Sequence, residues 1–124
     1  MSLVDDLQIT ELRLEGGNRF VSKMKLSQYH AQPIGFLNGG ATLAYAEAIA
    51  GRMSFELLPE GSFAVGQSIT AQHVHSTRCE GYLHAAGELL HKGRRSHVWN
   101  IRMTDDSGAL ISQVTVTCAI VNMK

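Results

Sequence analysis

Apolar and polar side chains alternate along most of this chain, and the alternation predicts its strands. In residues 96–103, His97, Trp99, Ile101 and Met103 fall on one face of an extended chain. The same period of two predicts strands over residues 20–26 and 110–121. Residues 63–77 form a long extended run, and residues 82–91 are expected to return beside it as a further strand. Residues 5–15 could begin as a helix, but the pattern favours a strand from Ile9. Glycine-rich or polar segments favour turns between most of these strands, at residues 16–18, 79–81, 92–95 and 105–108.

One segment breaks the alternation. Residues 41–51 are rich in alanine, the residue with the highest helix propensity. Asn38-Gly39 is a common hairpin signal, but no β-branched alternation follows it. We therefore predict a helix with Asn38 as its N-cap. Because Pro59 cannot continue a helix, we expect its end near residues 57–58.

The predicted order of elements is β-β-α-β-β-β-β. Consecutive strands joined by short turns are expected to be antiparallel, and one long helix can cover one face of their sheet. The fold class is therefore α+β. At 124 residues we expect one domain spanning residues 1–124.

Charge and composition exclude several classes of partner. Lys and Arg together number 11, as do Asp and Glu, so no basic excess indicates a nucleic-acid partner. No apolar run approaches the ~20 residues of a membrane span, and no signal peptide is visible. Cys79 and Cys118 form no disulfide framework, which fits a reducing compartment. We expect a cytoplasmic protein without nucleic-acid or membrane partners.

One face of the predicted helix carries small residues and a single acid. Gly40, Ala44, Glu47 and Gly51 share this face because their spacing is helical. The small residues indicate close packing against a sheet or a second helix. A carboxylate on such a face is rare unless it is paired or functional. Glu47 therefore either reaches solvent, pairs with Arg52, or takes part in chemistry.

The start of the helix offers a second chemical group. Its first amides lack intrahelical partners, and Gly39 and Gly40 have no side chain to block a ligand. Such amides can stabilise a developing oxyanion. Gly39 and Glu47 lie ~12 Å apart along the axis, so one helix cannot easily offer both groups to one carbonyl. Two helices packed antiparallel across a two-fold axis can, which predicts a dimer with two shared sites.

The motif Gln32-Pro33-x-Gly35-x-x-Asn38-Gly39-Gly40-Ala41, followed by Glu47, resembles the hot dog fold acyl-CoA thioesterases. The similarity is to the phenylacetate-pathway, 4-hydroxybenzoyl-CoA and 1,4-dihydroxy-2-naphthoyl-CoA types. It extends from about Ile9, with supporting blocks at residues 65–73 and 91–99. A leading helix common in relatives looks absent or trimmed.

The resemblance implies hydrolysis of an aromatic or medium-chain acyl-CoA. Glu47 falls where the family places its nucleophile or general base. Gly39 falls at the amide that polarises the thioester carbonyl, and Gln32 at a residue that orients the thioester or water. The family needs no metal and no cofactor beyond the coenzyme A of its substrate. It forms homodimers, usually paired as homotetramers.

Two positions depart from the family pattern. Asn38 stands where relatives have His; its amide can donate a hydrogen bond as a catalytic residue but cannot carry charge, so any pH-dependent help from an imidazole is lost there. Alternatively, Asn38 serves only as the helix cap. Gly51 stands where relatives often have Ser or Thr one turn after the acid. These departures leave open a non-catalytic acyl-CoA-binding protein, such as a sensor or carrier. A dehydratase or hydratase is disfavoured because it would need a His near the helix start.

Further residues are candidates for substrate contacts. Coenzyme A needs basic groups for its phosphates, and the resemblance places its nucleotide end at a turn made of Gly93, Arg94, Arg95 and Ser96. Arg78 is another candidate, although an ordinary solvated turn would also carry such charges. His73 matches a position near the acyl pocket, where it lines the pocket or packs. His73 and His75 could hold zinc with a third ligand, which no spacing implies. The remaining histidines, His30, His84, His91 and His97, are expected to be structural or exposed.

Overall fold

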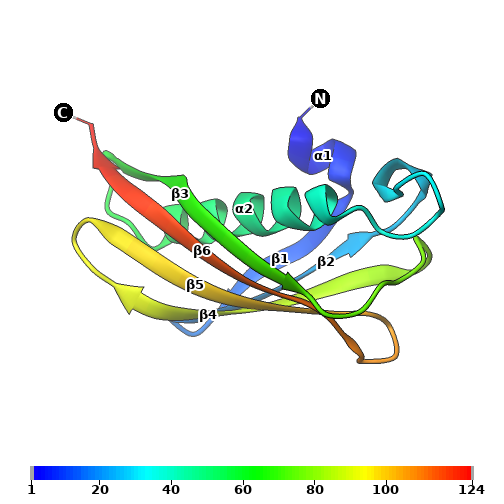
Figure 1. Cartoon of the computed structure of the whole chain (residues 1–124). Helices are drawn as coiled ribbons and strands as arrows, with labels where there is room; N and C mark the ends of the chain where they lie inside the picture. Colours follow the sequence, from blue (N-terminus) through cyan, green and yellow to red (C-terminus); the bar gives the residue numbers. More distant parts are fainter. Residues whose placement is uncertain (1, 124) are drawn as a thin grey trace.

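The computed structural model describes residues 2–123. Its strands form one sheet in the order β1-β2-β4-β5-β6-β3, with every neighbouring pair antiparallel. The long helix α2 lies along the concave face of this curved sheet (Figure 1). The predicted α+β arrangement is confirmed. In chain order the elements are α1 (Leu3–Leu7), β1 (Ile9–Glu15), β2 (Arg19–Lys25), η1 (Gln28–His30), α2 (Gly39–Glu56), β3 (Ser62–His73), β4 (Tyr82–Lys92), β5 (Ser96–Thr104) and β6 (Leu110–Asn122).

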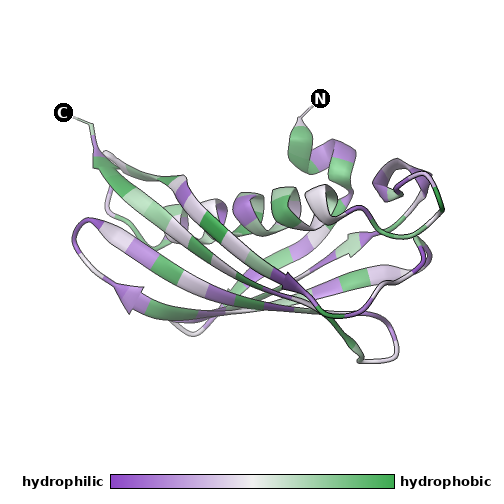
Figure 2. Ribbon diagram, in the orientation of Figure 1, coloured by the Kyte–Doolittle hydropathy of each residue, from purple (hydrophilic) through white to green (hydrophobic). Residues whose placement is uncertain are grey.

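The core lies between α2 and the sheet, and the alternation of the strands fills it. Bands of opposite hydropathy alternate along the strands in Figure 2. On β5 the four residues predicted to share the inner face are all buried. α2 contributes Tyr45, Ile49 and Met53 to the same core, at spacings that place them on one helical face. The period-two pattern therefore located the core correctly.

The limits of α2 follow from local chemistry. The Oδ1 atom of Asn38 accepts a hydrogen bond from the Gly40 amide at 2.8 Å, so the predicted N-cap is confirmed. The helix ends at Glu56, with Leu57 as its C-cap, shortly before Pro59. An 18-residue helix is thereby fixed at both ends and faces the sheet along its length.

Two features differ from the sequence prediction. A short leading helix, α1, precedes β1, and the Oγ atom of Ser2 caps it by accepting from the Asp5 amide at 3.2 Å. β3 ends at His73 rather than at residue 77. The amides of Val74 and His75 both donate to the carbonyl of Ile111, at 2.8 and 3.2 Å. Two successive amides on one acceptor cannot continue a regular ladder, so the strand stops there.

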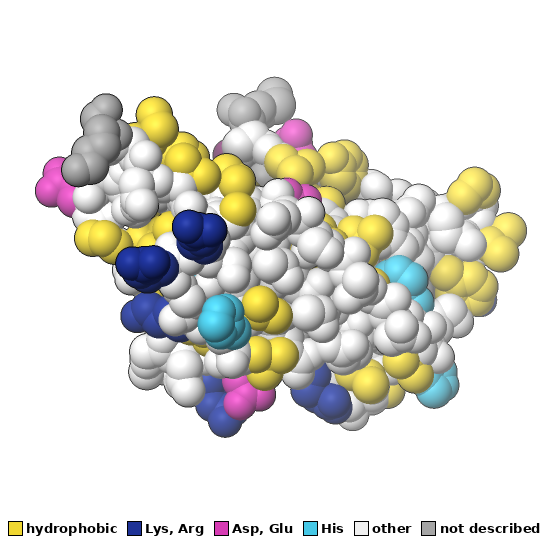
Figure 3. All heavy atoms as spheres, turned by 60° about the vertical axis from the view of Figure 1, so that its left-hand side comes forward, with side chains coloured by type: hydrophobic (Ala, Val, Ile, Leu, Met, Phe, Trp, Pro, Cys, Tyr) yellow, Lys and Arg dark blue, Asp and Glu magenta, His cyan; other side chains and the backbone are white. Residues whose placement is uncertain are grey.

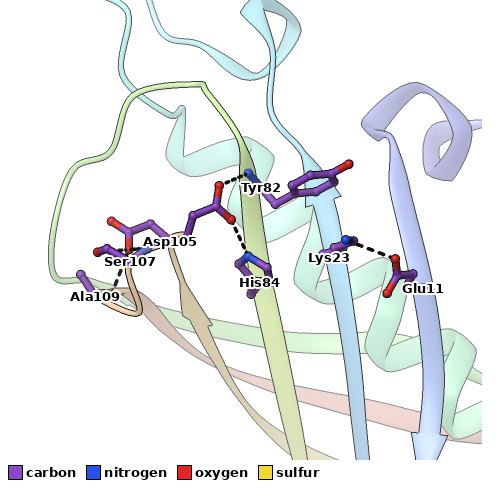
Figure 4. A network of polar contacts seen from close by, with 8 residues as sticks. Glu11, Lys23, Tyr82, His84, Asp105, Ser107 and Ala109 are labelled. Atoms are coloured by element: carbon purple, nitrogen blue, oxygen red, sulfur yellow. Dashed lines mark hydrogen bonds and ion pairs between the residues drawn. The ribbon is translucent and has the colours of Figure 1, made fainter.

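A polar network joins β1, β2 and β4 to the β5–β6 turn at one end of the sheet (Figure 4). The Nε2 atom of His84 on β4 lies 2.6 Å from Oδ1 of Asp106, whose Oδ2 accepts from the Tyr82 amide at 3.2 Å. The hydrogen bond from His84 lowers the pKa of Asp106. Lys23 lies 3.2 Å from Glu11 and 4.3 Å from the centre of the Tyr82 ring. This network attaches the β5–β6 turn to β4 without contributing to the inner core.

Two buried polar links join α2 to the sheet among residues 2–123: the Tyr45 hydroxyl donates to Oγ of Ser22 at 3.0 Å, and Ser54 connects to β5. The indole Nε1–H of Trp99 donates to Oγ of Ser54 at 2.8 Å, and Nδ1 of His97 lies 2.8 Å from the same oxygen. Because indole can only donate, the Ser54 hydroxyl is free to donate to His97 Nδ1. Burial lowers the pKa of His97, with Lys92 and His91 acting in the same direction. A neutral His97 that accepts at Nδ1 satisfies the whole link.

Removing this hydroxyl tests the link. We expect Ser54→Ala to lower the free energy of unfolding by ~2–3 kcal/mol, because Trp99 Nε1 and His97 Nδ1 lose their buried partner. Urea unfolding followed by Trp99 fluorescence measures this change. The matched control is Ser107→Ala in the exposed β5–β6 turn, where the hydroxyl donates to the solvent-exposed carboxylate of Asp105 and a change below about 1 kcal/mol is expected. Equal effects of the two substitutions would show that the link contributes nothing.

Candidate active site

The motif segment before α2 folds into a tight loop. The amide of Gln32 donates to the Phe36 carbonyl at 2.7 Å, and the amide of Gly35 donates back to the Gln32 carbonyl at 2.9 Å. The side-chain Oε1 of Gln32 accepts from the amides of Ile34 and Phe36, at 2.6 and 3.3 Å. Gly35 has φ +95°, which favours glycine. The Gln32 and Gly35 of the motif are therefore required by the loop itself.

The loop leads into the start of α2, where one backbone amide has no hydrogen-bond partner in the described part of the chain. The Asn38 amide donates to the His30 carbonyl at 2.8 Å, and the Gly40 amide is taken by the Asn38 cap. Among residues 2–123 the Gly39 amide has no hydrogen-bond partner. Since a helix N-terminus carries partial positive charge, this amide suits a carbonyl oxygen that gains negative charge.

A cavity of about 370 Å³ opens beside this amide. Gln32, Gly39 and His73 line it, which brings three predicted site residues together. His73 lies so close that a Cβ atom on Gly39 would stand 2.9 Å from its Nε2 atom. Gly39 therefore lacks a side chain partly because the imidazole occupies that space. The cavity is also lined by residues that the sequence analysis did not assign to a site, among them Thr42, His75, Thr77 and Ser112.

Glu47 lies in the middle of α2 and faces a different cavity, of about 430 Å³. Its side chain is exposed, and its carboxylate lies against Gly66 on β3, where a Cβ atom would overlap it. Within residues 2–123 the carboxylate has no hydrogen bond or ion pair. Arg52 pairs with Glu56 at 3.1 Å instead, so the Glu47–Arg52 pairing considered from the sequence is wrong. Small residues surround the acid, as the helix face predicted: Ala44, Ala48, Gly51 and Ala64.

The cavities of Gly39 and Glu47 share no lining residue. Both groups belong to one straight helix and are separated by eight residues, about 12 Å along its axis. A single chain therefore does not present the amide and the carboxylate to one carbonyl group. This is the geometry that the spacing predicted.

A third cavity, of about 630 Å³, lies between the end of α2 and the β4–β5 hairpin. Gly93, Arg94 and Arg95 line it together with Lys92 and His97. Both arginines are exposed, and neither forms an ion pair within the described part of the chain. Figure 3 shows Lys and Arg side chains gathered on the left of the face in view. The hairpin thus offers free positive charge beside a cavity.

Two predicted contact residues lie outside this basic cavity. Ser96 begins β5 and closes the hairpin, with its carbonyl accepting from the Gly93 amide at 2.9 Å. The guanidinium of Arg78 lies 4.9 Å from the centre of the Phe36 ring, over the motif loop. The structure therefore places Arg78 with the Gln32 loop and not with Arg94 and Arg95.

Comparisons with known proteins agree with this fold. The family model of the thioesterase superfamily matches residues 34–112, more than half of the chain. The 1,4-dihydroxy-2-naphthoyl-CoA hydrolase of Escherichia coli is 36% identical over 113 residues, which cover 89% of this chain and 82% of that protein. The crystal structure of yhdA from Lactococcus lactis has a TM-score of 0.95 and 48% identity, covering 100% of both chains. A relative from Deinococcus radiodurans is 40% identical over 93 residues, 74% of this chain, but these span only 58% of that protein.

The chain belongs to the thioesterase superfamily and has its hot dog fold. By family it is a thioester hydrolase. In residues 2–123, no cluster of three or more His, Cys, Asp or Glu side chains could hold a metal ion. The same residues contain no helix long and apolar enough to cross a bilayer.

The contact between Gly39 and His73 can be tested directly. We expect Gly39→Ala to lower the turnover of a thioester substrate at least about tenfold, because the added methyl group displaces the imidazole and narrows the cavity. Steady-state kinetics measure the loss, and thermal unfolding checks that the fold persists. Gly17→Ala is the matched control, since no atom lies within 4 Å of the added Cβ. Unchanged turnover in Gly39→Ala would contradict the assigned role of this close approach.

Proposed function

We propose that the protein hydrolyses an acyl-CoA thioester to the free acid and coenzyme A. The observation that carries this proposal is the pair of free groups on α2: the Gly39 amide at its start and the Glu47 carboxylate at its middle. Each faces a cavity, and neither has a hydrogen-bond partner within residues 2–123. Free polar groups of complementary kind are what thioester hydrolysis requires.

In the proposed reaction, the Gly39 amide and the Glu47 carboxylate have different roles. The Gly39 amide donates to the thioester carbonyl and stabilises the oxyanion as it forms. Glu47 either attacks the carbonyl carbon or removes a proton from the attacking water. The carbon–sulfur bond then breaks and coenzyme A leaves as the thiolate. Gln32 holds its Oε1 in the motif loop, which leaves its amide NH₂ to orient the thioester or the water.

The site requires a second copy of the chain. Among the described residues, β3 is an edge strand that pairs only with β6, and its middle is exposed, including Val65 at 42%. Antiparallel pairing of β3 with the β3 of a partner across a two-fold axis would join the two sheets and set the helices antiparallel. Glu47 of one subunit would then approach Gly39 of the other. We propose this homodimer as the minimal active unit, and two dimers as a homotetramer.

The same arrangement accounts for the basic cavity. Arg94 and Arg95 lie near the C-terminal end of their own α2, and antiparallel helices bring that end toward the N-terminal end of the partner's α2. The phosphates of coenzyme A would therefore bind at the hairpin while the thioester reaches Gly39 of the partner subunit. Charge-assisted hydrogen bonds from guanidinium groups suit these phosphates. Arg78, on the motif loop, is a further candidate for contact with the coenzyme.

The acyl group is proposed to be aromatic or medium-chain. The 36% identity to an aromatic acyl-CoA hydrolase supports the aromatic class. A panel of benzoyl-, phenylacetyl- and fatty acyl-CoAs, assayed for free thiol, would identify the preferred group. Two free cysteines fit a cytoplasmic protein, which we also propose.

Glu47→Gln tests the chemistry. We expect kcat to fall by about 10³-fold or more, because an amide can neither attack the carbonyl nor accept a proton. Size-exclusion chromatography with light scattering should show an unchanged dimer. Glu56→Gln, nine residues or about two and a half turns further along α2, is the matched control and should retain full kcat. Near-normal turnover by Glu47→Gln would reject the assignment, whereas binding of acyl-CoA without thiol release by the wild type would favour a non-catalytic binding protein.

Removing the hairpin charges tests the binding of coenzyme A. We expect the double substitution of Arg94 and Arg95 by Ala to raise KM about tenfold and to leave kcat within about twofold, because these groups hold a part of the substrate that does not react. The increase in KM should shrink as salt is added, since screening weakens exposed charges in the wild type. Arg13→Ala, on the exposed strand β1, is the control. A KM equal to that of the wild type would place the phosphates elsewhere.

A further inference from the structure

Ser112 is a buried polar residue of the first cavity that the proposed reaction does not yet use. It lies on β6 with no exposed surface, directly opposite His73 of β3 in the strand register. Its Oγ atom lies 2.9 Å from His73 Nδ1. Within residues 2–123, this is the only side-chain hydrogen bond of either group. The contact therefore fixes the imidazole from one side and leaves Nε2 free.

The free Nε2 atom points toward the start of α2. It is the imidazole atom nearest to the Cβ position of Gly39, at 2.9 Å, whereas Cδ2 and Cε1 lie at 3.4 and 3.5 Å. A Cβ atom stands ~2.5 Å from its own amide nitrogen, so Nε2 lies at most ~5.4 Å from the Gly39 nitrogen. This is less than twice an ordinary hydrogen-bond length of about 2.9 Å. The spacing therefore allows one oxygen atom to accept from both groups.

We propose that Ser112 is a positioning residue that makes His73 a second hydrogen-bond donor beside the Gly39 amide. This inference rests on the proposed function. The Ser112 hydroxyl donates to Nδ1, which places the imidazole proton on Nε2. Nε2–H and the Gly39 N–H then donate to the same thioester oxygen. No proton is transferred, so the step needs no acid, base or co-reactant.

The rest of the site supports a neutral donor at this place. The Oδ1 atom of Asn38 accepts the cap hydrogen bond of α2, and its side-chain amide carries no charge. Apart from His73, the lining of the first cavity contains one titratable residue, His75. In the proposed dimer Glu47 of the partner subunit also faces the site. An imidazole held from β6 thus adds a donor beside the Gly39 amide.

The tautomer of His73 tests the proposal without depending on activity. The ¹⁵N chemical shifts of the wild type at pH 8, assigned by comparison with His73→Gln, should show a protonated Nε2 and an unprotonated Nδ1. In Ser112→Ala the shifts should move toward a mixture of tautomers. A protonated Nδ1 in the wild type would overturn the proposal, because the hydroxyl would then be the acceptor.

Kinetics give the second readout. We expect Ser112→Ala to lower kcat about tenfold with KM within about twofold, because the oxyanion needs the donor more than the bound substrate does. Ser112→Thr keeps the hydroxyl and should restore most of kcat. Ser22→Ala removes another buried hydroxyl, bonded to Tyr45 and to the Thr10 carbonyl, and should lower stability without changing kcat or the His73 shifts.

The outcomes separate this inference from the proposed function. Unchanged kcat in Ser112→Ala, or no recovery in Ser112→Thr, would overturn the role of Ser112 while leaving hydrolysis intact. If the wild type hydrolyses no acyl-CoA, the proposed function fails and the donor role toward a thioester fails with it. If Ser112→Ala does not fold, the tautomer of the wild type and the kcat of Ser112→Thr still decide.

Discussion

The fixed rise of an α-helix is the constraint on which this molecule depends. Gly39 and Glu47 are carried on the same rigid rod, and eight residues separate them. No rotation of side chains closes that gap, since a mid-helix Glu reaches only about one turn toward the N-terminus. The structure accordingly gives each group its own cavity. The proposed exchange of groups between two chains is the simplest arrangement that brings them to one carbonyl.

The sheet supports the helix in two ways that serve the site. Its concave face packs against α2, and the hydrogen bonds of Ser54 with Trp99 and His97 hold the helix in position. Its edge strand β3 comes close to both functional groups. Gly66 leaves room for the Glu47 carboxylate, and His73 at the strand end fills the space above Gly39. Small changes in β3 would therefore affect both cavities.

Much of the fold could be predicted because its patterns are local. The alternation in residues 96–103 predicts a strand, and the alanine-rich segment after Asn38 predicts a helix. Both predictions depend only on neighbouring residues, and Asn38 caps the helix as expected. The end of β3 could not be predicted in this way. It depends on a long-range contact, the shared acceptor at Ile111, that no local pattern contains.

The site was only partly predictable for the same reason. The Gln32 motif and the isolated acid Glu47 are unusual enough in sequence to attract attention. Ser112 is not unusual in this way. It is, however, a polar residue at one of the alternating positions of β6 that face the core, and a polar residue at such a position was the available signal. Its pairing with His73 joins residues 39 positions apart and appears only when the strand register is known.

The exposed edge of β3 has a consequence for how the enzyme responds to its own abundance. If that edge is the junction between subunits, a lone chain holds two half-sites and no complete one. Specific activity would then obey mass action, falling on dilution below the dissociation constant of the dimer and recovering on concentration. The same unpaired edge makes the isolated chain a template for unwanted strand addition, so assembly would protect the protein from aggregation while it completes the site.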